Sequence, residues 1–251
     1  MSFRHFIEKA DKAGYLLTID RPVDTTFEIA NVAHALEGRP VLFNHIDGYS
    51  GWRVCAGPCA DRAFFSLALD VPVPALMRHL ADALAQPVAP PLVDSAPCQE
   101  VVVEEVDLDQ LPILLHLPQD AGHYIASAVV IVEDPDLGRN MCYHRLLRLD
   151  KRHFAARIVE NRGTYTALQK SSGDLPVAIC IGVSLAVHLA ASMSPPPGVD
   201  ELAVAHALAP TPLVKCLTND LSVPADAEIV LEGRISHQLV SEGPFMDLTE
   251  T

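Results

Sequence analysis

A twelve-residue segment, 86–97, is the strongest constraint on how this chain can fold. Its sequence, QPVAPPLVDSAP, holds four prolines. Proline has no amide hydrogen to donate and fixes its own φ angle, so neither the interior of a helix nor a central strand accepts such a run. The segment therefore predicts a boundary or crossover between two domains, which we place at 1–97 and 98–251.

The part of the chain before this segment has the pattern of an α/β domain. Apolar residues recur at helical spacing in four stretches and form short continuous runs in three others. Gly14 and Gly38 stand where helices should stop, and Thr25 or Thr26 stands where a helix should begin. The pattern predicts helices over 3–13, 27–36, 60–69 and 74–85, and strands over 15–19, 40–46 and 54–57.

The second half differs in character, because runs rich in Val and Ile replace most of the helical periodicity. Short connections such as DPDLGRN and LDKR predict antiparallel neighbours. We therefore expect a β-sheet or barrel with inserted helices. The predicted strands cover 101–105, 125–133, 141–149, 153–159, 177–181, 212–217 and 228–235, and the predicted helices cover 184–193 and 200–208.

The charge of the chain excludes one class of partner. Its 251 residues include 18 basic and 32 acidic side chains, a formal net charge of −14, and nucleic acids are bound by surplus Lys and Arg. The N-terminus lacks the apolar core of a secretory signal, and the longest stretch without charges, 175–199, is interrupted by Gly, Ser and three consecutive prolines. With six scattered cysteines expected to stay reduced, the sequence predicts a cytoplasmic protein without a membrane span.

Two local clusters of titratable residues allow more than one interpretation. His116 and His123 flank Asp120 in HLPQDAGHY, either as a metal or acid–base cluster or as part of a structured loop. Glu242 and Asp247 lie five positions apart across a Gly–Pro turn, either as two carboxylates facing one cavity or as solvated loop acids. Two neighbouring carboxylates with an Arg beside them split their pKa values, so that one can deliver a proton near neutral pH.

Five dispersed motifs, in order, give the chain a family resemblance. They are NMCYHR (140–145), SMSPPPGVDE (192–201), VKCLTND (214–220), VPADAEIVLEG (223–233) and EGPFMD (242–247). Together they resemble the UbiD family of decarboxylases. The resemblance implies an N-terminal α/β domain, then a flavin-reductase-like split β-barrel, then a C-terminal α/β domain. It also implies that the barrel is incomplete at its C-terminal end and that the C-terminal domain is absent from this chain.

The resemblance implies a chemistry and the residues that perform it. UbiD-like enzymes are reversible, non-oxidative decarboxylases of aromatic or α,β-unsaturated carboxylic acids, and they use prenylated FMN. Arg145 matches the active-site arginine of the family, Glu242 the glutamate paired with it, and Asp247 the acid that protonates the carbon left by carbon dioxide. Met246 stands where the family often has Gly, which would narrow the pocket.

The resemblance also implies a cofactor site with a metal. The metal would be Mn²⁺ or Mg²⁺, with K⁺ as a further cation, and its ligands would be Asn140, Asn161 and Glu201. Asn161 stands where the family has His, so the metal site is either altered or lost. The residues matching the segments that hold the cofactor are Asn140, Cys142, Tyr143, His144, Arg145, Ser192, Met193 and Glu201.

The implied partners leave two functional classes open. A small carboxylic acid is the substrate, a flavin prenyltransferase supplies the cofactor, and the chain forms a homo-oligomer or joins a complementary chain. The leading hypothesis is the decarboxylase. The alternative is a non-catalytic or partner-dependent subunit of the same fold, favoured by Asn161 and by the end of the chain at Thr251. A flavin reductase sharing only the barrel would not explain the paired acids.

Overall fold

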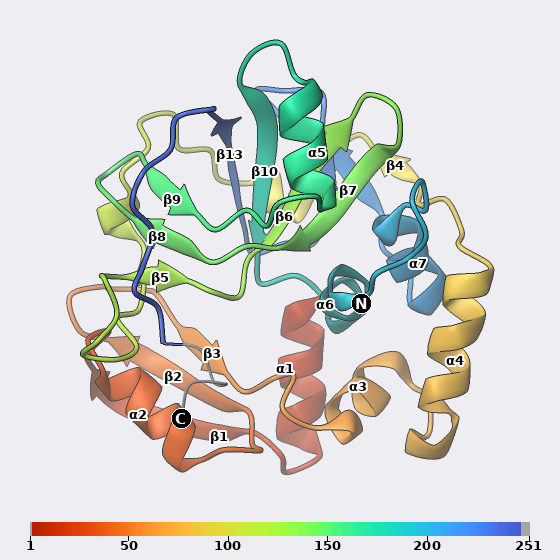
Figure 1. Ribbon diagram of the computed structural model, residues 1–251. Helices are drawn as coiled ribbons and strands as arrows, with labels where there is room; N and C mark the ends of the chain where they lie inside the picture. The colour runs from red at the N-terminus through yellow and green to blue at the C-terminus, as the bar shows by residue number, and fades with distance from the viewer. Residues whose placement is uncertain (1, 247–251) are drawn as a thin grey trace.

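The computed structural model describes residues 2–246. It shows a mixed α/β fold in which four small sheets lie beside a group of helices (Figure 1). The N-terminal sheet has the order β1-β2-β3, with the first pair parallel and the second antiparallel. Its elements are β1 (Leu17–Val23), α2 (Glu28–Ala35), β2 (Val41–Ile46) and β3 (Val54–Ala56). The elements α2, β2 and β3 occur where the sequence predicts them, whereas β1 begins and ends later than the predicted 15–19. Ile29 of α2 packs with Val41 and Phe43 in a common core.

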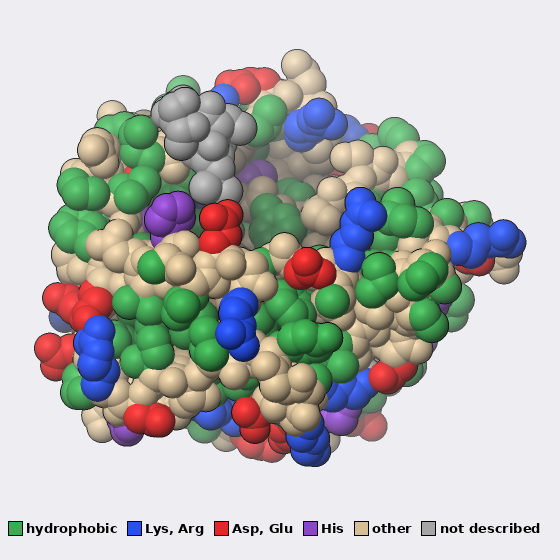
Figure 2. All heavy atoms as spheres, turned by 90° about the horizontal axis from the view of Figure 1, so that it is seen from below, with side chains coloured by type: hydrophobic (Ala, Val, Ile, Leu, Met, Phe, Trp, Pro, Cys, Tyr) green, Lys and Arg blue, Asp and Glu red, His purple; other side chains and the backbone are tan. Residues whose placement is uncertain are grey.

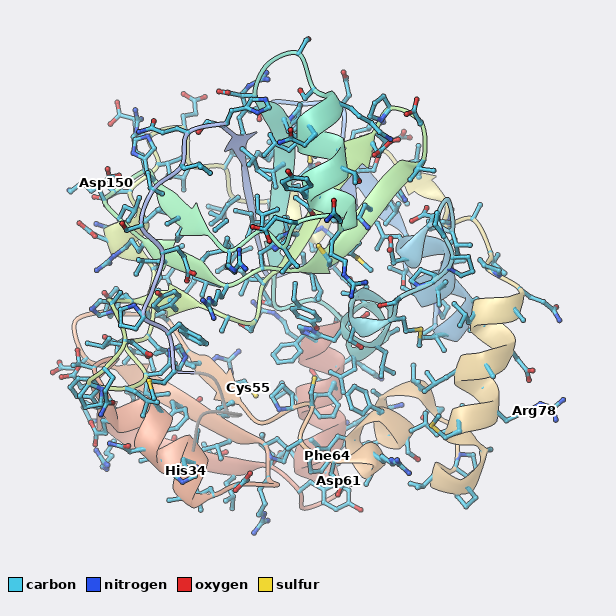
Figure 3. The ribbon with its side chains drawn as sticks, viewed as in Figure 1. His34, Cys55, Asp61, Phe64, Arg78 and Asp150 are labelled. Atoms are coloured by element: carbon cyan, nitrogen blue, oxygen red, sulfur yellow. The ribbon has the colours of Figure 1, made fainter. Side chains whose placement is uncertain are left out.

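The helices on the other side of the molecule come from both halves of the chain. They are α1 (Phe3–Lys12), α3 (Arg62–Leu69), α4 (Val73–Ala85), α6 (Leu185–Ser192) and α7 (Glu201–Leu208). Phe64 of α3, labelled in Figure 3, shares a core with Phe6 of α1 and Leu185 of α6. Leu76 of α4 belongs to the same core as Val204 of α7. Helices from both sides of residue 97 therefore pack together, and the division at that residue stays a prediction.

A four-stranded antiparallel sheet forms the centre, in the order β13-β10-β6-β7. Its strands, and the helix that covers one face, are β6 (Val129–Asp134), β7 (Gly138–Tyr143), α5 (Gly163–Lys170), β10 (Leu175–Ile181) and β13 (Ile229–Ile235). Successive side chains of a strand point to opposite faces. Val129 and Ile131 accordingly face the core with α6 and α7, and Val130 and Val132 face the core with α5.

A second antiparallel sheet, β5-β8-β9, lies beside the central one. Its strands are β5 (Tyr124–Ile125), β8 (Leu146–Arg148) and β9 (Phe154–Ala156). The chain passes from β5 into β6 and from β7 into β8, so two neighbouring strands change sheets at one corner. The prediction of unbroken strands over 125–133 and 141–149 was therefore wrong, because the backbone turns at 126–128 and 144–145 to change sheets.

The remaining elements include further corrections. No strand forms over 101–105, where Val101 is 81% exposed and the backbone has no sheet partner. Neither Thr25 nor Thr26 caps α2, since Phe27 precedes that helix with φ of 65° and no side-chain cap. The proline segment contains a short strand within the sheet β12-β11-β4. The remaining strands and 3₁₀ helices are β4 (Leu92–Val93), β11 (Leu213–Lys215), β12 (Ser222–Pro224), Pro97–Gln99 and Leu108–Gln110.

The sequence also led us to expect a β-sheet or barrel and no membrane span. None of the four sheets formed by residues 2–246 closes on itself as a barrel. No helix in this part of the chain has both the length and the apolar character required to span a bilayer.

Candidate functional site

The corner where β7 leads into β8 holds an arginine paired with a glutamate. Arg145 donates from Nε and Nη2 to the two carboxylate oxygens of Glu242, each at 2.9 Å. Its guanidinium also lies over the ring of Phe245, 5.2 Å from the centroid. The Glu242 side chain is only 8% exposed. A two-point ion pair of this kind fixes the orientation of both groups, so the structure brings these two predicted catalytic residues together.

A loop around residues 116–124 holds the segment that carries Glu242. Ala121 N donates to Pro244 O at 2.7 Å, and Met246 N donates to Asp120 Oδ1 at 2.9 Å. The Gly243–Pro244 peptide bond of this segment is cis. The Phe245 ring packs at 4.6 Å from the ring of Tyr124. Burial, and then the negative charge of Glu242, raises the pKa of Tyr124 to about 12. Asp247, the third predicted catalytic residue, lies outside the described residues.

The histidine cluster of the same loop has structural contacts. His123 Nδ1 lies 2.7 Å from Ile113 O, and the ring of His116 packs edge-on against Phe245. Burial lowers the pKa of His116. Within residues 2–246, no group of three or more His, Cys, Asp or Glu side chains is placed to hold a metal. These contacts agree with the structured-loop interpretation of HLPQDAGHY.

A second polar cluster lies where β7 meets the start of α7. Asn140 Nδ2 donates to Glu201 Oε1 at 3.3 Å, and Met141 N donates to Glu201 Oε2 at 3.0 Å. Glu201 is the first residue of α7 and is 6% exposed. Burial raises its pKa, and Glu201 forms no salt bridge within the described part of the chain. The cluster therefore holds a buried carboxyl group beside an amide, without a cationic partner from those residues.

Side chains from α5 and the β7–β8 corner extend this cluster. Thr164 Oγ1 donates to Asn140 Oδ1 at 3.4 Å and lies 2.9 Å from His144 Nε2. His144 Nδ1 lies 3.0 Å from Arg157 O. Cys142 Sγ lies 3.3 Å from both His144 Nε2 and Thr164 Oγ1. Burial lowers the pKa of His144 and raises that of Cys142, so both groups are held neutral.

The structure brings together two of the three predicted metal ligands. Asn161 is exposed, has φ of 61°, and makes no hydrogen bond to Asn140 or Glu201 among the contacts of residues 2–246. Gly163, two positions later, allows a close approach to Asn140. A Cβ atom at Gly163 would lie 2.5 Å from Asn140 Cγ and Oδ1 and 2.6 Å from Nδ2. The three-residue metal set stays a prediction.

The remaining predicted cofactor residues lie where β7 meets α6. Tyr143 OH lies 2.5 Å from His188 Nδ1, and the two rings stack with an interplanar angle of 7°. Burial lowers the pKa of His188 to about 4. At the end of α6, Ser192 Oγ donates to Leu189 O at 2.7 Å, and Met193 packs against the main core. The Tyr143–His188 pair thus joins the two segments predicted to hold the cofactor.

Two concave regions adjoin these residues. Figure 2 shows a hollow lined by apolar side chains, between the N-terminal sheet and α1, and Cys55 of β3 lies at this gap (Figure 3). Burial raises the pKa of Tyr143. A separate groove of about 1690 Å³ borders Arg145 and Glu242. Its floor and rim include Val130, Val177, Ile179, Val101, Val102, Val103, Leu239 and Val240.

Sequence reasoning missed several residues of these clusters. Thr164 and Gly163 belong to α5, a helix with too few apolar residues to reveal its period. Tyr124 follows the DAG segment, and Phe245 lies inside the quoted EGPF motif, but neither was given a role. Aromatic residues inside the motifs were the available signal for Tyr124 and Phe245.

Comparison with known proteins identifies the family of this chain. The model of the 3-octaprenyl-4-hydroxybenzoate carboxy-lyase N-terminal domain matches residues 7–84, and that of the Rift-related domain of the same carboxy-lyase matches residues 92–251. Anhydromevalonate phosphate decarboxylase of Methanosarcina mazei is 36% identical over 256 residues, covering 100% of this chain and 59% of that protein. Pyrrole-2-carboxylic acid decarboxylase of Pseudomonas aeruginosa is 32% identical, covering 97% and 54%.

Solved structures give the same result. An evolved dimeric form of the UbiD-class enzyme HmfF from Pelotomaculum thermopropionicum, in complex with prFMN, superposes with a TM-score of 0.93 at 38% identity, over 97% of this chain and 60% of that one. The closed form of Sedimentibacter hydroxybenzoicus vanillic acid decarboxylase gives 0.94 at 26% identity, over 100% and 58%. The chain thus spans less than two thirds of the length of these relatives. The resemblance carried by the five motifs is confirmed, and the chain belongs to the UbiD family.

Proposed function

We propose that this chain carries the cofactor-binding and catalytic residues of a prenylated-FMN-dependent decarboxylase that acts reversibly on an aromatic or α,β-unsaturated acid. The observation that carries the proposal is the Arg145–Glu242 pair, held at two points over Phe245 in the β7–β8 corner. Asn140 lies five positions before Arg145, on the strand β7 that leads into this corner, beside Glu201. One short strand therefore links the two polar clusters.

The proposed fold is more specific than the mixed α/β arrangement described above. In this proposal the sheets β13-β10-β6-β7 and β5-β8-β9 belong to one split β-barrel of the flavin-reductase type, within a domain of residues 98–251. Two neighbouring strands that pass from one sheet to the other support it, because strands that change sheets make the corners of barrel-like packings. Residues 1–97 then form the N-terminal α/β domain.

The donor set beside β7 fits a divalent cation. Asn140 and Glu201 offer an amide and a carboxylate oxygen, the ligands that Mg²⁺ and Mn²⁺ prefer. A cation would also compensate the buried Glu201, which forms no salt bridge with residues 2–246. In a chain with net charge −14, such a cation is a source of the positive charge that a flavin phosphate requires. Asn161 is the proposed third ligand, and K⁺ a further cation.

The chain's own residues have distinct tasks in this proposal. When bound, prenylated FMN supplies the electron sink that lets carbon dioxide leave. Cys142, Tyr143, His144, Ser192 and Met193 position it. Arg145 binds the substrate carboxylate, and Glu242 keeps the guanidinium in orientation through their two hydrogen bonds. Asp247, two positions after Phe245, delivers a proton to the carbon that loses carbon dioxide.

The relatives restrict the substrate only to a class. One decarboxylase among them is named for anhydromevalonate phosphate and another for pyrrole-2-carboxylic acid, so we propose a small carboxylic acid. A flavin prenyltransferase is the proposed source of the cofactor.

A partner-dependent form of this function is the second candidate. The observation that favours it is the groove bordering Arg145, whose rim carries Val101 at 81% and Leu239 at 96% exposure. Apolar surface of this kind is typical of a protein interface. In this form a second copy or a complementary polypeptide covers the groove before the site can act.

The test is to produce this chain in cells that also make a flavin prenyltransferase. We expect bound prenylated FMN, identified by mass spectrometry and by an absorbance different from that of FMN. We also expect that, when the acid supplied is a substrate, solvent deuterium is incorporated at the carbon that loses carbon dioxide. Cofactor without exchange would favour the partner-dependent form, and adding the partner should restore exchange. Colourless, ligand-free protein would contradict the proposed function.

A further inference from the structure

We propose that Thr164 and His144 form a hydrogen-bond relay that turns the Asn140 amide, so that its oxygen faces Glu201 and prepares the site for a divalent cation. The inference rests on the proposed function, which places the cation between Asn140 and Glu201. Thr164 and His144 contact neither the cation nor the substrate in this scheme. Both are therefore positioning residues.

The contact between His144 and the Arg157 carbonyl determines which nitrogen of the imidazole carries the hydrogen. The carbonyl oxygen of Arg157 can only accept a hydrogen bond, and it lies 3.0 Å from His144 Nδ1, so Nδ1 carries the hydrogen. In a neutral imidazole the other ring nitrogen is then an acceptor. Thr164 Oγ1 lies 2.9 Å from this Nε2. The shortest of the three contacts made by the Thr164 hydroxyl is therefore one in which it can donate to His144.

Thr164 has one hydroxyl hydrogen, so the relay has two states. In one, Thr164 donates to Asn140 Oδ1 at 3.4 Å, the Cys142 thiol donates to His144, and Asn140 Nδ2 donates to Glu201. In the other, Thr164 donates to His144 and offers only lone pairs to Asn140. The amide then turns by 180° about its terminal torsion, and its NH₂ group donates to Thr164. The oxygen and nitrogen of an amide have nearly the same shape, so the turn changes polarity alone.

The second state places two oxygens at the cation site. The amide oxygen then occupies the position, 3.3 Å from Glu201 Oε1, that the amide nitrogen holds in the first state. Two oxygens facing each other repel unless a cation lies between them, and together they offer two ligands to it. Cation binding therefore favours the second state, and the relay favours the cation.

The packing around Asn140 permits this turn. A Cβ atom at Gly163 would lie at 2.5–2.6 Å from Cγ, Oδ1 and Nδ2 alike, so the amide lies flat over the glycine. Exchange of its oxygen and nitrogen leaves that plane unchanged. Thr164 is 1% exposed and His144 is 8% exposed, so water does not replace either group.

The experiment is a titration of the chain with Mn²⁺, followed by the electron paramagnetic resonance of the free ion. Thr164→Val removes the hydroxyl with little change of shape, and we expect Mn²⁺ affinity to fall by about 10- to 100-fold, the usual effect of removing a group that orients a metal ligand. Thr164→Ser keeps the hydroxyl and should bind nearly as the original does. Thr166→Val is the matched control, because the Thr166 hydroxyl lies on the same helix but donates to Gly163 O.

A second variant tests the relay without removing it. Cys142→Ala deletes the thiol that donates to His144 in the first state, so the second state gains population and Mn²⁺ should bind as well as before or more tightly. Thermal melts show which variants are folded. Equal affinity of folded Thr164→Val, or weaker binding by folded Cys142→Ala, would overturn the relay while the proposed function stands. Absence of Mn²⁺ binding by the unaltered chain would instead overturn the cation site of the proposed function, and the relay with it.

Discussion

The two polar clusters along β7 are built in different ways. Asn140, Thr164 and Glu201 come from a strand and two helices, and Thr164 and Glu201 are 1% and 6% exposed. Arg145 and Glu242 come from a corner between sheets and from an irregular segment, and the Arg145 side chain is 30% exposed. The first cluster is part of the core, whereas the second depends on how residues 242–246 dock. Under the proposed function, changes in the corner should alter turnover, and changes near Glu201 should alter cation binding and stability.

The largest effect is expected at the proton donor. Asp247→Asn should lower the turnover of cofactor-loaded protein on the order of 10²-fold or more, the scale for loss of a positioned general acid. The absorbance of the bound cofactor should not change, because this residue is not assigned to cofactor binding. Deuterium exchange at the product carbon measures the effect. Near-normal exchange would remove Asp247 from the proposed role.

Arg145→Ala should lower turnover by about 10- to 100-fold and also raise KM, since the substrate carboxylate loses a charged hydrogen-bond donor. It also leaves the Glu242 carboxylate buried without its arginine. Removal of one member of a buried ion pair lowers the free energy of unfolding by about 3–5 kcal/mol, so we expect a lower Tm. Arg148→Ala is the control, because Arg148 lies on β8 but pairs with Asp109 at 3.0 Å. Equal effects of the two substitutions would mean that the corner has no special role.

Phe245→Leu tests the packing that orients the corner. The ring lies 5.2 Å from the Arg145 guanidinium, and such a contact contributes about 0.5–2 kcal/mol. Kinetic assays should therefore show kcat/KM lowered by about 2- to 30-fold, with Mn²⁺ affinity unchanged. A loss of Mn²⁺ binding in this variant would show that the two clusters are not independent.

The smallest effect is expected from Glu201→Gln in protein kept free of metal by a chelator. Burial raises the pKa of Glu201 in the folded chain, so the unfolded chain gives up this proton first and stability falls as pH rises above the ordinary range of a glutamate. The substitution removes this cost and should raise Tm by about 2–4 °C at neutral pH. Melts repeated at acidic pH, where Glu201 is protonated in both states, should show no difference. A lower Tm at neutral pH would contradict the prediction.

The sequence predicted regular elements better than corners. The sequence pattern found α1, α4, α6 and α7 nearly to their ends. The first two have one apolar face that is buried, and the last two are apolar and buried on nearly all sides. It failed at 144–145, because apolar residues lie on both sides of His144 and Arg145 and local propensity carries no information on which sheet a strand joins. It also placed a strand over 101–105, where β-branched residues have no partner strand.

The candidate site shows the same limit. Motifs identified Asn140, Glu201, Arg145 and Glu242, and the structure brings each pair together. Thr164 was missed, because it acts through a contact across 24 positions of sequence, from a helix that periodicity did not reveal. Asn161 rests on the family resemblance alone, and it lies exposed just before that same helix. The sequence pattern therefore predicted most helices and strands, but it did not predict which side chains of different elements contact one another.

The cores shared across the proline segment have a consequence for how this chain folds. Leu185 packs with Phe6 and Phe64, and the segment itself is tied to the second half where Val88 N donates to Ala203 O at 3.1 Å. A cut between residues 86 and 97 would therefore expose apolar faces on both fragments. The helices of the first half should gain their final stability only when α6 and α7 have formed, so cooperative unfolding should span the boundary that composition marks most clearly.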